Sequence, residues 1–159
     1  MPHGTGLKAL LLDDDEYAIE FLQAILLDRY PGLEIERRLE PDPTGEFDLY
    51  FLDDDFEGIR LAGRLARRIR AQRPRAVIIA FSASLDRGTL KELLNAGCSG
   101  VCDKKVPTDM PRMLESLDRA VETLEEERSR PPDTLSGSYL VRTFKDLFQE
   151  WNRRLEAQE

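Results

Sequence analysis

The chain reads, from Leu7 to Asp15, Leu-Lys-Ala-Leu-Leu-Leu-Asp-Asp-Asp, a short apolar run that ends abruptly in three aspartates. From Leu49 to Asp55 it reads Leu-Tyr-Phe-Leu-Asp-Asp-Asp, which repeats the same arrangement. Short apolar runs bounded by polar residues are typical of buried strands in a parallel sheet. The carboxyl ends of parallel strands lie along one edge of the sheet, so we expect the two groups of aspartates to meet there.

Helical and strand patterns alternate along most of the rest of the chain, which indicates an α/β domain with a mostly parallel sheet. Further strands are predicted at 33–39, 76–81 and 100–103. Helices are predicted around 18–26, 59–69 and 90–94, and from 108 or 109 to 124. Five strands interleaved with helices favour a doubly wound sheet, whose ligand site lies at the carboxyl ends of the strands.

Length and composition exclude several classes of protein. The 159 residues suit one ordinary domain with a small appendage, and the net charge of −8 argues against a surface built to bind nucleic acid or an anionic membrane. The single histidine, His3, and the two cysteines, Cys98 and Cys102, rule out a disulfide framework and a histidine-rich metal site. No apolar run is long enough to span a membrane and no secretory signal is recognisable, so a cytoplasmic protein is expected.

Polar residues that suit phosphoryl chemistry follow the predicted strands. Asp13 and Asp14 follow the first strand and Asp53 the third; Ser82 follows the fourth and Lys104 the fifth. Carboxylates held close together repel one another unless a cation lies between them, and oxygen ligands favour a hard ion such as Mg²⁺. A hydroxyl and an ammonium group at the same edge would bind the oxygens of a transferred phosphoryl group.

Four segments carry a likeness to a known family: Leu-Leu-Asp13-Asp14, Asp48-Leu-Tyr-Phe-Leu-Asp53, Val-Ile-Ile-Ala-Phe-Ser82-Ala83 and Ala96-Gly-Cys-Ser-Gly-Val-Cys-Asp-Lys104. With these segments in order, residues 7–127 resemble the receiver domain of two-component response regulators. The resemblance implies a flavodoxin-like sheet of five parallel strands in the order 2-1-3-4-5. It also implies a phosphoprotein that takes part in signal transduction through a phosphorelay and is not an enzyme with a released product.

The resemblance also assigns a role to each site residue. Asp53 would be the phosphoacceptor, taking phosphoryl from a sensor histidine kinase or a phosphotransfer protein. Asp14, Asp53 and the backbone carbonyl of Asp55 would bind Mg²⁺ directly, and Asp13 would bind it through water. Ser82 would hydrogen-bond a phosphoryl oxygen and Lys104 would pair with its charge. A one-residue shift in register would make Asp54 the acceptor instead, and one residue of Asp13–Asp15 is expected to cap the following helix.

The sequence departs from the family in its loops. Residues 40–47 replace the family's second helix, and eight extended residues reach about 26 Å, which allows a crossing but no helix. Gly58, which is expected to open the next helix, follows Asp53 closely. Val101 stands where the family has an aromatic switch residue. These departures keep open a pseudo-receiver adaptor or dimerisation module that is not phosphorylated.

Two charged or acidic features have alternative interpretations. The arginines between residues 60 and 75 are favoured as a solvated helix face over a docking patch for an acidic partner or RNA. The Asp-x-Asp openings at Asp13 and Asp53 also match phosphatases of the haloacid-dehalogenase type, but no apolar strand with a final acidic pair follows Lys104.

A separate helix is predicted near the end of the chain. Residues 128–137 are linker-like, and residues 138–159 carry one apolar stripe: Leu140, Phe144, Leu147, Phe148, Trp151 and Leu155. The stripe, with Phe144, Phe148 and Trp151 as interaction residues, either fills apolar sheet surface uncovered by the lost helix or holds a homodimer or an output protein. Assembly is the favoured alternative, and a DNA-binding output is not expected from a single helix.

Overall fold

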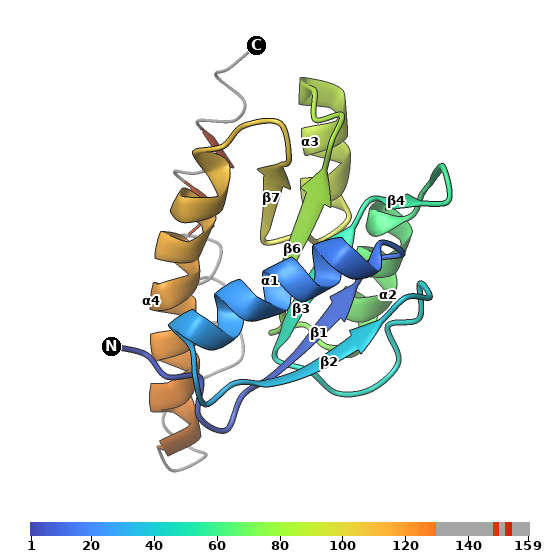
Figure 1. Ribbon diagram of the computed structural model, residues 1–159. Helices are drawn as coiled ribbons and strands as arrows, with labels where there is room; N and C mark the ends of the chain where they lie inside the picture. Colours follow the sequence, from blue (N-terminus) through green and yellow to red (C-terminus); the bar gives the residue numbers. More distant parts are fainter. Residues whose placement is uncertain (130–147, 150–151, 154–159) are drawn as a thin grey trace.

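The computed structural model describes residues 1–129, 148–149 and 152–153. Five strands form one parallel sheet in the order β2-β1-β3-β6-β7 (Figure 1). Their bounds are Lys8–Leu12 for β1, Glu34–Arg38 for β2, Leu49–Asp53 for β3, Val77–Ser82 for β6 and Gly100–Asp103 for β7. The predicted flavodoxin-like α/β fold, with strand order 2-1-3-4-5, is confirmed.

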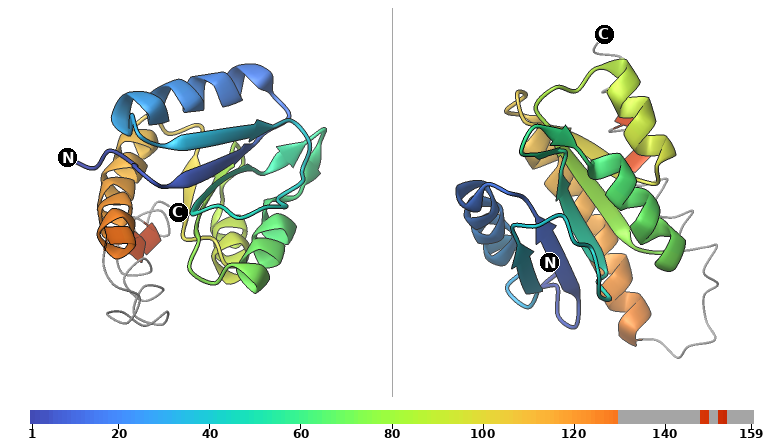
Figure 2. Two further views of the ribbon diagram at one scale, coloured as in Figure 1. Left: turned by 90° about the horizontal axis from the view of Figure 1, so that it is seen from below. Right: turned by 90° about the vertical axis from the view of Figure 1, so that its right-hand side faces the viewer.

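Helices cover both faces of the sheet (Figure 2). The helices are α1 (Glu16–Arg29), α2 (Ala62–Gln72), α3 (Arg87–Asn95) and α4 (Asp109–Ser129). α1 and α4 lie on one side, and α2 and α3 lie on the other. Every residue of β3 and β6 is buried, because both faces of these central strands are covered. Polar side chains of these strands therefore gather at the strand ends, where the sheet meets solvent.

The second helix of the predicted pattern is missing, as expected from the short connection. Residues 39–48 form a loop between β2 and β3, and Arg38 organises it. Its guanidinium pairs with Glu36, donates hydrogen bonds of 2.7 Å to the carbonyls of Asp42 and Thr44, and lies 5.5 Å from the centre of the Phe47 ring.

The loss of that helix does not uncover an apolar surface, which corrects the expectation from the sequence. β2 reads Glu-Ile-Glu-Arg-Arg, so four of its five side chains are charged, and its one apolar side chain, Ile35, is partly buried against the core. Within the loop, Phe47 turns inward, since it is 8% exposed and packs edge-on against Tyr50, whereas Leu39 stays exposed. Because most side chains of β2 are charged, this strand can face solvent without a covering helix.

The segment after β3 also differs from the prediction. β4 (Asp55–Phe56) and β5 (Ile59–Arg60) form a small antiparallel hairpin, and α2 begins only at Ala62. Gly58 does not open the helix; it has φ 85° and follows Glu57, which has φ 52°. Positive φ at both central residues is the geometry of a type I′ two-residue turn, which suits the twist of a hairpin. The hairpin therefore separates the end of β3 from α2.

The far end of the chain contacts the edge of the sheet formed by β7. α4 continues to Ser129, two residues into the predicted linker, and the rest of that linker lies outside the described residues. Phe148 is fully buried in the core, and Asn152 Nδ2 donates a hydrogen bond of 2.9 Å to the carbonyl of Ser99, just before β7.

This contact is made within one chain, at the sheet edge opposite to β2 (Figure 1). Phe144 and Trp151 lie outside the described residues. No helix in the described part of the chain is both long and apolar enough to cross a membrane.

Candidate functional site

The predicted site residues converge at the carboxyl edge of the sheet. Asp13 and Asp14 follow β1, Asp53 ends β3, Ser82 ends β6 and Lys104 follows β7. They line one cavity of about 440 Å³. The remaining described residues that line it are Asp15, Asp54, Asp55, Gly58, Arg60, Ala83 and Ser84.

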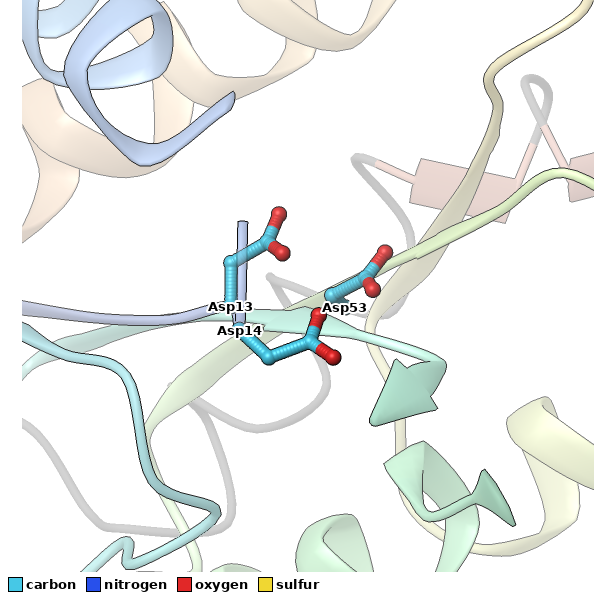
Figure 3. Close-up of side chains that lie close together, drawn as sticks. All are labelled: Asp13, Asp14 and Asp53. Atoms are coloured by element: carbon cyan, nitrogen blue, oxygen red, sulfur yellow. The ribbon is translucent and has the colours of Figure 1, made fainter. Parts of the chain in front are cut away.

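Three carboxylates form the centre of this cavity. One oxygen from each of Asp13, Asp14 and Asp53 lies within 4.8 Å of the others, and Figure 3 shows the three side chains beside one another at the strand ends. Asp53 is buried, Asp13 is half-buried and Asp14 is exposed. Such a set of oxygen atoms suits Mg²⁺, which commonly keeps several waters and takes only a few carboxylates. The cluster thus fits a hard cation approached from solvent.

Burial makes ionisation of this cluster unfavourable. It raises the pKa of Asp13 to about 6, and the charges of Asp53 and Asp14 add to the effect, against a hydrogen bond from Asp15 and the charge of Lys104. Burial also raises the pKa of Asp53, although Lys104 opposes this change. The carboxylates would therefore gain from a cation placed among them.

Lys104 forms an ion pair with Asp53. Burial by itself would lower the pKa of Lys104, but its bond to Asp53 and the nearby charges of Asp13 and Asp55 outweigh burial and raise it. The ammonium group is therefore held charged beside the carboxylate, at the place where a phosphoryl group on Asp53 would develop negative charge.

The aspartates after β1 divide their roles. Asp15 is the N-cap of α1, because its carboxylate accepts hydrogen bonds from the backbone N–H groups of Tyr17 and Ala18 at 3.0 and 3.4 Å. Asp13 Oδ1 accepts the N–H of Asp15 at 2.9 Å, which orients the Asp13 carboxyl at the cluster. The expectation that one of the three caps the helix is confirmed, and the capping residue is the one outside the carboxylate cluster.

Asp54 is engaged away from the cluster. Its Oδ2 accepts a hydrogen bond from Arg60 Nε at 3.0 Å, and its Oδ1 accepts the N–H of Ala62 at 3.2 Å. The N-cap residue of α2, Leu61, has no side-chain cap, so Asp54 supplies this function from a distance. Asp53, in contrast, contacts Lys104 and belongs to the carboxylate cluster.

The β4–β5 hairpin is the part of the site that sequence reasoning missed. The N–H of Glu57, at its turn, donates a hydrogen bond of 2.8 Å to Asp14 Oδ2. The N–H of Gly58 donates one of 2.6 Å to Asp55 Oδ1. The pattern Phe56-Glu-Gly-Ile59, a Gly-containing pair between two apolar residues, was the available signal. Asp55 and Arg60 lie opposite each other in the two strands of this hairpin. That the backbone carbonyl of Asp55 binds Mg²⁺ stays a prediction.

Ser82 and Val101 lie deeper than the acidic groups. Ser82 is 3% exposed, and its Oγ accepts the N–H of Ser84 at 3.2 Å. Val101 is fully buried in β7, so its side chain belongs to the core.

The two cysteines, Cys98 and Cys102, are also core residues. Burial raises the pKa of both thiols to about 12, which disfavours thiolate chemistry at either position.

The arginines between residues 60 and 75 serve different purposes. Arg70 donates to the carbonyls of Pro74, Ala76 and Gly97, and Arg73 donates to that of Phe47. Arg64, Arg67, Arg68 and Arg75 are exposed and form no salt bridge with the described residues. The solvent-exposed basic face therefore contains fewer arginines than the sequence indicates, because Arg70 and Arg73 bind backbone carbonyls.

Comparison with known proteins gives a fold and no close relative. No protein-family model matches the sequence, and a search of curated proteins found no match. A CheY-like receiver domain protein from Methanospirillum hungatei matches with a TM-score of 0.62 and 20% identity, over 76% of this chain and 98% of that one.

Two proteins from Thermotoga maritima are similar to the same degree. The response regulator DrrB, an OmpR/PhoB homologue, has a TM-score of 0.59 and 20% identity over 74% of this chain, which spans only 53% of DrrB. The response regulator TrrA, in complex with Mg²⁺-BeF, has a TM-score of 0.56 and 22% identity over 70% of this chain and 98% of TrrA. The chain thus shares the fold of response regulator receiver domains.

Proposed function

We propose that this chain is a receiver that accepts a phosphoryl group on Asp53 and thereby switches a protein–protein interaction. The observation that carries the proposal is the environment of Asp53. Its carboxylate meets those of Asp13 and Asp14 within 4.8 Å, pairs with Lys104, and faces the cavity that Ser82 also lines. This is a nucleophile placed between a cation site and a cationic side chain, as phosphoryl transfer requires.

The proposed reaction is a displacement at phosphorus. An oxygen of Asp53 attacks the phosphorus of a phosphohistidine on a sensor histidine kinase or a phosphotransfer protein. The O–P bond forms while the P–N bond breaks, and the imidazole leaves with the electron pair of that bond. Mg²⁺, when bound by Asp13, Asp14, Asp53 and the carbonyl of Asp55, would neutralise charge on the transferred oxygens.

The other residues bind the product. Lys104 would transfer part of its pairing from the carboxylate to the phosphoryl oxygens, because these oxygens carry more charge than the carboxylate did. Ser82 Oγ, now bonded to the N–H of Ser84, would donate its own proton to a phosphoryl oxygen. The acyl phosphate can be hydrolysed, so the change is reversible and suits a cytoplasmic switch. The chain would then act as a signalling domain and not as an enzyme that releases a product.

A second candidate function is a pseudo-receiver that binds partners without phosphorylation. The observation in its favour is Val101, which is fully buried where the family has a switch residue, so that the usual movement of an aromatic ring has no counterpart. A phosphatase of the haloacid-dehalogenase type has less support, since Lys104 is followed in the described residues by α4 and by no acidic strand end.

One experiment distinguishes the two leading candidates. The purified chain is incubated with acetyl phosphate and Mg²⁺ and examined by intact mass, and a parallel sample with beryllofluoride and Mg²⁺ is examined by NMR. A mass gain of one phosphoryl group, lost on removal of the Asp53 carboxylate, supports the receiver. No gain and no spectral change would favour the adaptor.

A further inference from the structure

We propose that Arg60, on the β4–β5 hairpin, is a second cation that binds the phosphoryl group. Before phosphorylation its side chain is paired with Asp54 and Glu92, and it turns into the cavity when Asp53 carries phosphoryl; we call it the reserve cation for this reason. This inference rests on the proposed function and assigns a phosphoryl-binding role to a residue outside the four segments that resemble the receiver family. Arg60 lines the same cavity as Asp53 and Lys104, although it comes from a different element.

The charge balance of the cavity creates a need for such a residue. Six aspartates and only two cations, Arg60 and Lys104, are found among the described residues that line it. A bound Mg²⁺ compensates for two of these negative charges, and a phosphoryl group on Asp53 adds negative charge again. Lys104 offers a single ammonium point charge, whereas a guanidinium can bind two phosphoryl oxygens at once.

The present contacts of Arg60 leave it able to move. Its Nε donates to Asp54 at 3.0 Å and its terminal NH2 group lies 3.7 Å from Glu92, so much of its donor capacity is unused. The side chain is half exposed, as is that of Glu92, and such ion pairs hold their partners weakly. A dianionic group in the cavity would compete well with Glu92 for the guanidinium.

The backbone that carries Arg60 is fixed, so that only the side chain has to turn. The hairpin is joined to the first strand end through the Glu57 N–H bond to Asp14, and to α2 through the bond between Asp54 and the N–H of Ala62. Arg60 itself pairs with Asp55 in the small sheet. Rotation of the side chain from Asp54 and Glu92 into the cavity requires no refolding.

The reserve cation should have opposite effects on the affinities of the site for Mg²⁺ and for a phosphoryl analogue, and this difference can be measured. A positive charge on the cavity wall repels Mg²⁺ and attracts a phosphoryl analogue. With Arg60→Gln, we expect Mg²⁺ alone to bind about twofold more tightly, and beryllofluoride at saturating Mg²⁺ to bind about tenfold more weakly, a change of about 1.4 kcal/mol. Isothermal titration calorimetry on the full chain measures both affinities.

Two further variants complete the experiment. Glu92→Gln removes one resting partner of Arg60, and we expect beryllofluoride to bind about two- to threefold more tightly, in the direction opposite to Arg60→Gln. Arg64→Gln, at an exposed position of α2 that does not line the cavity, is the matched control and should leave both affinities within about twofold.

The outcomes separate this inference from the proposed function. If the unmodified chain binds no beryllofluoride with Mg²⁺, the proposed function fails and the role of Arg60 fails with it. If the unmodified chain binds while Arg60→Gln binds equally well, or loses both ligands in parallel, only the inference fails. Should Arg60→Gln not fold, Glu92→Gln decides alone, since an unchanged affinity there overturns the reserve role.

Discussion

Asp53 and Asp54 are adjacent in the chain and equally buried, at 5% exposure each, yet their carboxylates have different partners. Successive side chains of a strand point to opposite sides, so Asp53 turns to Lys104 and the carboxylate cluster while Asp54 turns to Arg60 and the start of α2. These contacts support the proposal that Asp53, and not Asp54, is the phosphoacceptor, which stays a prediction.

The two residues should respond differently to the same substitution. We expect Asp53→Asn to take up no phosphoryl from acetyl phosphate with Mg²⁺, because the nucleophilic oxygen is gone. Asp54→Asn should still be modified but lose about 1–2 kcal/mol of unfolding free energy, through its weakened bonds to Arg60 and Ala62. Intact mass and urea denaturation measure the two effects. Phosphoryl on the Asp53→Asn chain would contradict the assignment.

Mg²⁺ should stabilise the fold through Asp14. At a free Mg²⁺ concentration about ten times the Kd, linkage gives about 1.4 kcal/mol, or about 3–5 °C in Tm for a chain of this size. Asp14→Asn is the matched variant, since the amide oxygen can still accept the Glu57 N–H while the charge is removed. We expect the Mg²⁺-dependent rise in Tm to disappear in it. An equal rise in both chains would argue against ligation by Asp14.

The raised pKa of Asp13 predicts a pH dependence with a definite sign. Between pH 3.8 and about 6 the folded chain keeps a proton on Asp13 that the unfolded chain has released, so the stability of the Mg²⁺-free protein falls as pH rises through this window. Asp13→Asn should therefore be more stable than the unmodified chain at pH 7.5, by about 2–4 °C in Tm, with the difference much smaller at about pH 4.5 and closed below pH 3.8. A constant difference at both pH values would refute this.

Arg38 should be the residue that most stabilises the loop replacing the second helix. It binds Glu36 and two loop carbonyls and lies over Phe47, so we expect Arg38→Ala to cost about 2–3 kcal/mol of unfolding free energy in urea denaturation. The neighbouring Arg37 is half exposed and pairs with Glu20 only at 4.0 Å. Arg37→Ala, the control, should change stability by less than about 0.5 kcal/mol.

The buried Phe148 predicts a stabilising contact between the end of the chain and its own sheet. Phe148→Ala should cost about 3–5 kcal/mol of unfolding free energy, whereas Phe21→Ala, at a position 66% exposed on α1, should cost less than about 0.5 kcal/mol.

Sedimentation tests the homodimer that the sequence favours, by comparing the full chain with a chain that ends at Arg130. If Phe148 docks within its own chain, the full chain sediments as a monomer; a dimer that is lost on truncation would show that the stripe acts between chains.

The sequence by itself determined the elements whose signal is local. The apolar runs that form β1, β3 and β6 are long enough and apolar enough to be strands buried on both faces. The eight residues 40–47, which follow the predicted second strand, are too few for a crossover helix. Because parallel strands present their carboxyl ends at one edge, the meeting of Asp13, Asp14, Asp53 and Lys104 also followed from the pattern.

Tertiary structure alone decided the relations that depend on direction and on contacts distant in sequence. The turn at Glu57 and Gly58 carries a local hairpin signal, which the helical spacing of the residues after it obscures. The bond of this hairpin to Asp14 and the position of Arg60 in the cavity could not be derived from that signal. The partners of Asp53 and Asp54 depended on which way each side chain leaves the strand. The burial of Phe148 in the core and the bond of Asn152 to the carbonyl of Ser99, just before β7, likewise depended on contacts between residues far apart in the sequence.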